Sequence, residues 1–188
     1  MQHILVAYVE DKPGVLNRVA SLFRRRAFNI ESLTVGHTEQ PGVSRMTIVV
    51  DADEMMTRRI EANLYKLVNV LRVDDVTEKP AVVRDLALIK VAVKNGNRGE
   101  ILQLADVFRA RVVDVTNESL VIEITGTEDK IDGLVEVLRP FGLIEMVRTG
   151  MVAMARGAEA VSPNPPLVAA HVPAESQTRA SQTVAMSV

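Results

Sequence analysis

The amino-acid sequence predicts an α+β protein in which a βαββαβ order of elements occurs twice in succession. Segments that alternate apolar and polar residues with period two are interleaved with segments whose apolar residues recur at helical spacing. The same order of segments is found in residues 2–77 and again in residues 85–148, and the proline-containing linker 78–83 separates them. A βαββαβ order produces an antiparallel sheet with two helices on one face, which is the ferredoxin-like arrangement.

The first half begins with a strand pattern at residues 2–10 in which both faces are apolar, so we expect both faces to be covered. Pro13 fits the first turn of a helix, because the N–H that proline lacks has no partner there. Strand character resumes over 28–37, where a slip in the apolar phase between Ile30 and Leu33 indicates a bulge. The apolar face of the intervening helix consists of Val15, Leu16, Val19, Leu22 and Phe23.

A third strand, a second helix and a short fourth strand complete this half. Residues 43–51 alternate cleanly, and residues 69–77 form the last strand. Either Asp51 or Asp53 fits the N-cap of the helix between them. The inward residues of the third strand are Met46, Ile48 and Val50, and those of the helix are Met56, Ile60, Leu64 and Leu67.

The second half repeats the order. A strand at 85–94 and a turn at 95–99 precede a helix marked by Ile101, Leu104, Ala105 and Phe108. The hairpin 111–116 and 119–125, a helix marked by Ile131, Leu134, Val135 and Leu138, and a strand at 142–148 follow. We therefore expect one domain at residues 1–78 and another at 79–157. The segment 158–188 is proline-rich, has no aromatic residue and no sustained period, and predicts a disordered tail.

Composition narrows the classes of function. The chain has no cysteine, which excludes disulfides, thiol nucleophiles and thiolate metal sites. Its formal net charge of −2 provides no general basic field, and its predicted strands lack the aromatic residues of RNA-binding sheets, so no nucleic-acid partner is expected. No apolar run approaches the roughly 20 residues of a membrane span, and the chain does not begin like a signal peptide. We expect a soluble cytoplasmic protein with no membrane partner.

Residues suited to catalysis are not grouped in the sequence. His3, His37 and His171 are scattered, and none has a metal-ligand spacing such as HExxH. The sequence contains no GxSxG motif and no convincing glycine-rich phosphate loop. We therefore expect no catalytic residue and no metal ligand.

The turn between the first strand and the first helix is a candidate binding site for a small amino acid. A helix N-terminus presents unpaired N–H groups to a carboxylate, and Gly14 allows a ligand to approach the backbone closely. Asp11 can accept a hydrogen bond from an ammonium group, and Asn29 can donate or accept from the neighbouring strand. The alternative is that Asp-x-Pro-Gly is only good turn and capping chemistry. The apolar wall of the pocket would consist of Val15, Leu16 and Ile30.

Several strings in the sequence resemble one family. EDKPGVLNRVASLFRRRAFNIESLTVGHTEQPGVSRMTIVV, residues 10–50, looks like the ACT domain of the acetolactate (acetohydroxyacid) synthase small subunit. LYKLVNVLRV at 64–73, DVT at 114–116 and GLIEMVRTGMVAMARG at 142–157 are also similar to that family. The resemblance covers about residues 2–157.

The resemblance implies a regulatory role. Small subunits of this family have no activity of their own and associate with a large subunit that condenses pyruvate with pyruvate or 2-oxobutyrate. They raise its activity and confer feedback inhibition by valine or another branched-chain amino acid. The large catalytic subunit is expected to carry thiamine diphosphate, Mg and FAD, whereas this chain carries no cofactor.

The resemblance also implies where the effector binds, namely between two ACT domains of a homodimer. It assigns the contacts from one chain to Asp11, Gly14, Val15 and Leu16, and those from its partner to Asn29 and Ile30. Some family members have Asn where this chain has Asp11, which bears on affinity and effector preference. The arginine run 24–26 is interpreted as a solvated helix end, with contact to the large subunit as the alternative. Two other functions remain open: an ACT-type sensor of another biosynthetic enzyme, and an enzyme in its own right.

Overall fold

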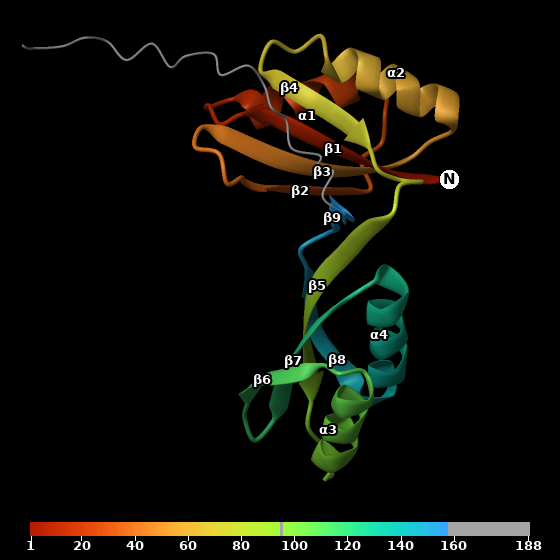
Figure 1. Cartoon of the computed structure of the whole chain (residues 1–188). Coiled ribbons are helices and arrows are strands. Elements are labelled where there is room, and N and C mark those ends of the chain that lie inside the picture. Colours follow the sequence, from red (N-terminus) through yellow and green to blue (C-terminus); the bar gives the residue numbers. More distant parts are fainter. Residues whose placement is uncertain (95, 158–188) are drawn as a thin grey trace, which may run out of the picture.

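The computed structural model describes residues 1–94 and 96–157, and these residues form two βαββαβ units (Figure 1). Each unit is an antiparallel sheet with two helices on one face, so the predicted α+β class with two consecutive ferredoxin-like units is confirmed. The tail that the sequence predicts to be disordered, 158–188, lies outside the described residues.

The first unit has the sheet order β2-β3-β1-β4, so β2 and β4 are its edge strands. β1 pairs with β3 in one unbroken register from Gln2 opposite Asp51 to Glu10 opposite Val43. The elements of this unit are β1 (Gln2–Glu10), α1 (Val15–Arg25), β2 (Ser32–His37), β3 (Val43–Asp51), α2 (Glu54–Leu64) and β4 (Val70–Asp75).

The second unit has the sheet order β6-β7-β5-β8, and a last strand, β9, pairs with the beginning of β5. β5 is long enough to belong to its own sheet and to reach the first unit (Figure 1). The elements are β5 (Ala81–Ala92), α3 (Arg98–Val107), β6 (Arg111–Val115), β7 (Ser119–Gly126), α4 (Glu128–Gly142), β8 (Leu143–Arg148) and β9 (Val152–Ala155).

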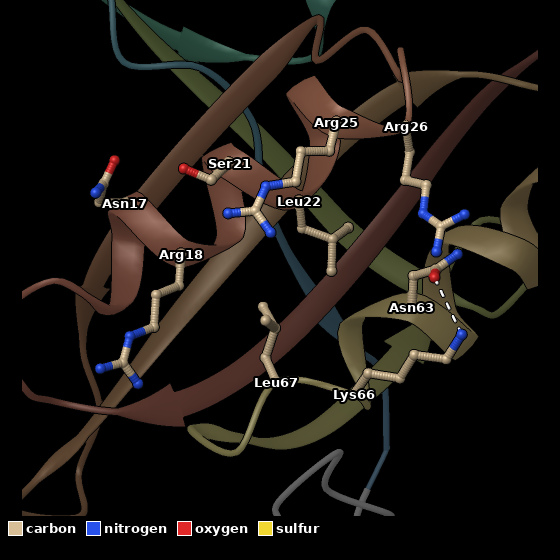
Figure 2. A pocket seen from close by; sticks show the side chains of 9 residues that line it. All are labelled: Asn17, Arg18, Ser21, Leu22, Arg25, Arg26, Asn63, Lys66 and Leu67. Carbon is tan, nitrogen blue, oxygen red and sulfur yellow. Dashed lines mark hydrogen bonds between the residues drawn. The ribbon is translucent and has the colours of Figure 1, made fainter.

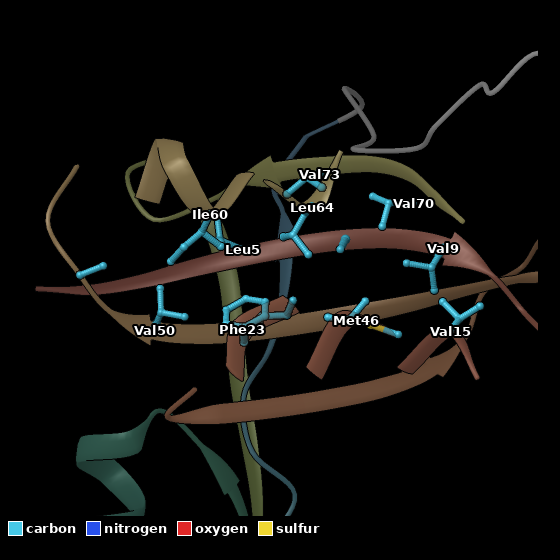
Figure 3. Close-up of a cluster of buried hydrophobic side chains, with 14 residues drawn as sticks. Leu5, Val9, Val15, Phe23, Met46, Val50, Ile60, Leu64, Val70 and Val73 are labelled. Carbon is cyan, nitrogen blue, oxygen red and sulfur yellow. The ribbon is translucent and has the colours of Figure 1, made fainter. Parts of the chain in front are cut away.

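The core of the first unit lies between its sheet and its helices (Figure 3). Leu5 and Val9 from β1 face Met46 and Val50 from β3 on the helix side, as the period-two pattern predicts. Phe23 of α1 is 1 % exposed in this core, and burial of such a side chain contributes about 1.5–3 kcal/mol. The helices are therefore held to the sheet mainly by aliphatic packing.

The opposite face of the first sheet is covered by the second unit. Val6 and Tyr8 of β1 form a separate buried cluster with Val76 and Ala153, and Ala153 belongs to β9. The guanidinium of Arg45 lies 5.8 Å from the ring centroid of Tyr8 and donates to the carbonyl of Ala153. The cover expected for both faces of the first strand is thus supplied within one chain.

One local prediction is resolved and one is corrected. Asp53 is the N-cap of α2, because its carboxylate accepts from the N–H of Met56 at 2.7 Å, whereas Asp51 pairs with the N-terminal amine at 2.7 Å. The predicted bulge in the second strand is wrong, because β2 begins only at Ser32 and its register with β3 is unbroken. The apolar phase slips because Ile30 packs on the core from a loop that precedes the strand.

The predicted linker 78–83 also differs from the structure, and the structure has one strand after the last predicted strand. β5 begins at Ala81, and its residues 81–84 pair with 152–155 of β9. β9 is absent from the sequence prediction, because its partner lies far away in the chain and a four-residue strand has little period of its own. Within the described residues, no helix is long and apolar enough to cross a membrane.

Candidate functional site

The predicted site lies where β1 turns into α1. Gly14 is the N-cap of α1 and has φ of +83°, a left-handed conformation that glycine adopts without strain. The turn is closed by a hydrogen bond from the N–H of Val15 to the carbonyl of Lys12 at 3.3 Å. A β-carbon added to Gly14 would meet no atom within 4 Å, so the space beside the Gly14 backbone is open to a ligand. Glycine is therefore required here by the backbone and also leaves space above it.

The first turn of α1 presents donors without partners. No side chain caps this end, and no acidic residue lies in the first turn. Within residues 1–94 and 96–157, the N–H groups of Leu16 and Asn17 have no acceptor, whereas the N–H of Arg18 pairs with Gly14 at 3.0 Å. These two N–H groups and the partial positive charge of the helix end suit a small carboxylate.

Asp11 is held in position by two residues that sequence reasoning did not assign to the site. Its carboxylate accepts from the hydroxyl of Ser44 at 3.2 Å and lies 3.2 Å from Nδ1 of His37. Ser44 and His37 are cross-strand partners at one end of the β2–β3 pair. The sequence gives no signal for this contact, because it depends on the register of three strands.

The predicted apolar wall is placed differently from the expectation. Val15 is 4 % exposed and belongs to the core, so its side chain does not line the turn. Leu16 is 45 % exposed beside the free N–H groups and is available to a ligand. Ile30 is partly buried against the same core, and the neighbouring Asn29 is exposed and donates to Glu31 at 2.5 Å.

One chain does not bring the two groups of site residues together. The turn at Asp11 adjoins His37, the last residue of β2, whereas Asn29 and Ile30 precede Ser32, the first residue. Six residues of β-strand separate these ends by about 20 Å. A ligand that contacts both groups therefore requires a second chain.

Apart from this turn, a cavity of about 390 Å³ lies between the two units. Asp85, which is 6 % exposed, accepts from the hydroxyl of Thr149 at 3.1 Å beside this cavity. Arg148 also lines it, and its Nε is buried without a partner among the described residues. This cavity holds both charge signs and is the competing location for a small zwitterion.

His3 is one of several buried polar residues of the first unit. Its Nδ1 lies 3.2 Å from the carboxylate of Asp75, which also accepts from the hydroxyl of Thr77 at 2.5 Å. Burial raises the pKa of Asp75, but the hydrogen bonds from Thr77 and the contact with His3 outweigh it, and the pKa lies below its usual value of 3.8. No group of three potential metal ligands is found in the part of the chain that the structure describes.

Comparison with known proteins agrees with this architecture. Residues 5–72 match the family described as the AHAS small subunit-like ACT domain, and residues 84–157 match that described as the small subunit of acetolactate synthase. A probable acetolactate synthase small subunit from Archaeoglobus fulgidus is 50% identical over 157 residues, which cover 84% of this chain and 98% of that protein. This chain belongs to the acetolactate synthase small-subunit family.

Two further members of the family are similar to this chain over most of their length. The acetolactate synthase small subunit of Mycolicibacterium smegmatis is 50% identical over 155 residues, covering 82% of this chain and 91% of the relative. The crystal structure of the small subunit from Thermotoga maritima superposes with a TM-score of 0.79 at 42% identity, covering 84% of this chain and 98% of that one. Membership of a small-subunit family implies a catalytic large subunit as partner.

Proposed function

We propose that this chain is the non-catalytic regulatory subunit of acetolactate synthase. It activates a large catalytic subunit that carries thiamine diphosphate, Mg and FAD, and it confers feedback inhibition by valine or another branched-chain amino acid. The effector binds between the ACT domains of a homodimer in the cytoplasm. The observation that carries this proposal is the position of the two halves of the site at opposite ends of an open edge strand.

An antiparallel pair of β2 strands would assemble the site twice. Among the described residues β2 pairs with no strand except β3, so its outer edge is free for strand pairing. When two such edges pair antiparallel about a two-fold axis, the beginning of one strand lies beside the end of the other. Asn29 of one chain then lies near the partner's Asp11. The pairing also covers an edge that would otherwise promote aggregation.

The residues at this junction match the groups of a free amino acid. The carboxylate of valine accepts from the N–H groups of Leu16 and Asn17, and the ammonium group donates to Asp11, which Ser44 holds in place. The side chain of valine contacts the exposed Leu16 and, across the junction, Ile30. Val15 contributes through its backbone only, because its side chain is in the core.

The regulatory signal arises from the relative arrangement of the two chains. A ligand that bridges two protomers favours the arrangement in which both of its contacts are made, and it shifts the assembly by no more than that difference in affinity. A coupling of about 1–3 kcal/mol changes the activity of a partner enzyme severalfold to about a hundredfold. β2 also contacts the second unit through Ser32 and Thr34, so a change at the dimer edge is transmitted within each chain.

Reconstitution tests the proposal. Acetolactate production is measured for the large subunit alone, for this chain alone and for the mixture, each with and without valine. We expect no product from this chain alone, faster production by the mixture and inhibition of the mixture by valine. If the mixture behaves as the large subunit alone but valine still binds this chain, the chain is an ACT-type sensor of another enzyme.

A further inference from the structure

The solvent-exposed side of the helix layer in the first unit contains a basic groove (Figure 2). It lies between α1 and the end of α2, and its volume is about 400 Å³. Two leucines form its apolar part, and cationic side chains surround them. We define the basic groove by Arg18, Leu22, Arg25, Arg26, Lys66 and Leu67.

The cations of the basic groove form no ion pair within the described part of the chain. No carboxylate lines the groove, and none of its four cations belongs to an ion pair there. Arg18 donates to the side-chain oxygen of Asn69 and Lys66 to that of Asn63, so both partners are neutral amides. Glu10 pairs with Lys12 at 3.1 Å and also attracts Arg18 from outside the groove, so Arg25, Arg26 and Lys66 carry the charge that has no nearby carboxylate among the described residues. In a chain whose formal net charge is −2, this is a local accumulation of charge.

The composition of the groove favours one class of occupant. Leu22 and Leu67 pack against the core from its edge and leave an apolar strip between the cations. No aromatic side chain is present on which a base could stack, which disfavours a single-stranded nucleic acid. A segment with carboxylates on either side of an apolar side chain would form ion pairs with the cations and cover the apolar strip. The groove therefore suits an acidic protein segment with an apolar residue in it.

The position of the groove leaves it accessible in the proposed assembly. The second unit covers the opposite face of the first sheet, through Ala153 and its neighbours. The proposed dimer uses the β2 edge, and the groove lies on the helices (Figures 1 and 2). Neither of these contacts occupies the helix layer of the first unit.

We propose that the basic groove docks an acidic segment of the large catalytic subunit. This inference rests on the proposed function, since it assumes that the large subunit is the partner. It assigns Arg25 and Arg26 to the protein interface, where the sequence alone favours a solvated helix end. Charge attraction of this kind accelerates association and weakens as salt is added.

The test uses the full chain and the purified large subunit. The double variant Arg25→Gln/Arg26→Gln removes two charges from the groove, and Arg24→Gln is the matched control, because Arg24 lies on the same helical turn outside the groove lining. We expect the double variant to bind the large subunit about tenfold more weakly, with a shallower dependence on salt. Arg24→Gln should change the affinity less than about twofold.

Valine binding and unfolding of each variant separate this inference from the proposed function. The double variant should bind valine and unfold as the unmodified chain does, because no residue of the effector site is changed. If the double variant and the unmodified chain bind the large subunit equally well, the docking role of the groove is wrong, but the proposed regulatory function is unaffected. If Arg24→Gln weakens binding as much as the double variant does, the docking role of the groove is also wrong, because the loss then reflects the net charge of the chain and not the position of the arginines. If the unmodified chain binds valine but not the large subunit, the proposed partner itself is wrong.

Discussion

The backbone N–H of Met151 donates a hydrogen bond to the hydroxyl of Ser32 at 3.2 Å, although one residue follows β8 and the other begins β2. The hydroxyl of Thr34 donates to the carbonyl of Thr149 at 3.2 Å beside it. Between them, Gly150 has φ of +86° and lies so close that an added β-carbon would be 2.4 Å from Ser32 Oγ. The edge strand at the proposed effector site is therefore in direct contact with the second unit.

Gly150→Ala should destabilise the chain by about 3 kcal/mol. Left-handed backbone costs about 1–2 kcal/mol for alanine, and the clash with Ser32 adds an overpacking cost of about 1–3 kcal/mol. Gly42→Ala is the matched control, because Gly42 has φ of +81° but no atom within 4 Å of its added β-carbon, and we expect about 1 kcal/mol.

Urea unfolding measures both glycine variants. Adding Ser32→Ala to Gly150→Ala should recover part of the loss, since it removes the clashing hydroxyl oxygen. Equal destabilisation by Gly150→Ala and Gly42→Ala would mean that the contact between the units is not as close as described.

Asn29→Ala should weaken valine binding about tenfold to a hundredfold and leave stability within about 0.5 kcal/mol. Asn29 is exposed and its recorded partner is the neighbouring Glu31, so the fold does not depend on it. Loss of one hydrogen bond to a charged ligand group costs about 1.5–3 kcal/mol. Calorimetric titration with valine, leucine and isoleucine measures the change, and Asn117→Ala in the hairpin of the second unit is the control. Unchanged affinity in Asn29→Ala would remove this residue from the site.

The stability of the chain should fall as the pH is lowered through the folded-state pKa of Asp75. This pKa is depressed, so the carboxylate contributes stability above its usual value of 3.8 and loses it below that value. Asp75→Asn should therefore flatten the dependence of the urea midpoint on pH below the usual carboxyl pKa of 3.8. A variant with the same slope as the unmodified chain would show that other carboxyl groups dominate acid unfolding.

Arg45→Met should loosen the β5–β9 ladder without unfolding either core. Methionine keeps the apolar stem but removes the donor to Ala153 and the cation beside Tyr8. Amide hydrogen exchange in 152–155 should accelerate about tenfold, whereas that of β7 should not change. Arg84→Met is the control on the same ladder, because within residues 1–94 and 96–157 the Arg84 side chain donates only to the adjacent Val83. Equal acceleration in both variants would exclude a specific role for Arg45.

Helices and strands with a strong hydrophobic period were predictable from the sequence. Within one of them, α1, Val15 was wrongly assigned to the wall of the pocket. Val15, Val19 and Phe23 follow one another at intervals of four and share the buried face of α1. Leu16, one position further round the helix, faces solvent. The helical spacing thus already contained the information that Val15 belongs to the core and Leu16 to the surface.

Features that depend on distant pairing were not predictable from local patterns. The contact of Asp11 with Ser44 and His37 requires the registers of β1, β2 and β3 together. The β9 strand pairs with the beginning of β5, and its Ala153 is buried on the far face of the first sheet. Such contacts carry no period or motif, and their energy comes from burial after the chain has folded.

A crystal structure of the chain grown with valine tests the central claim most directly. We predict a homodimer joined along β2, with valine between the turn from Asp11 to Leu16 of one protomer and Asn29 of the other. Valine in the cavity beside Asp85 and Arg148, with the β2 junction empty, would contradict the account.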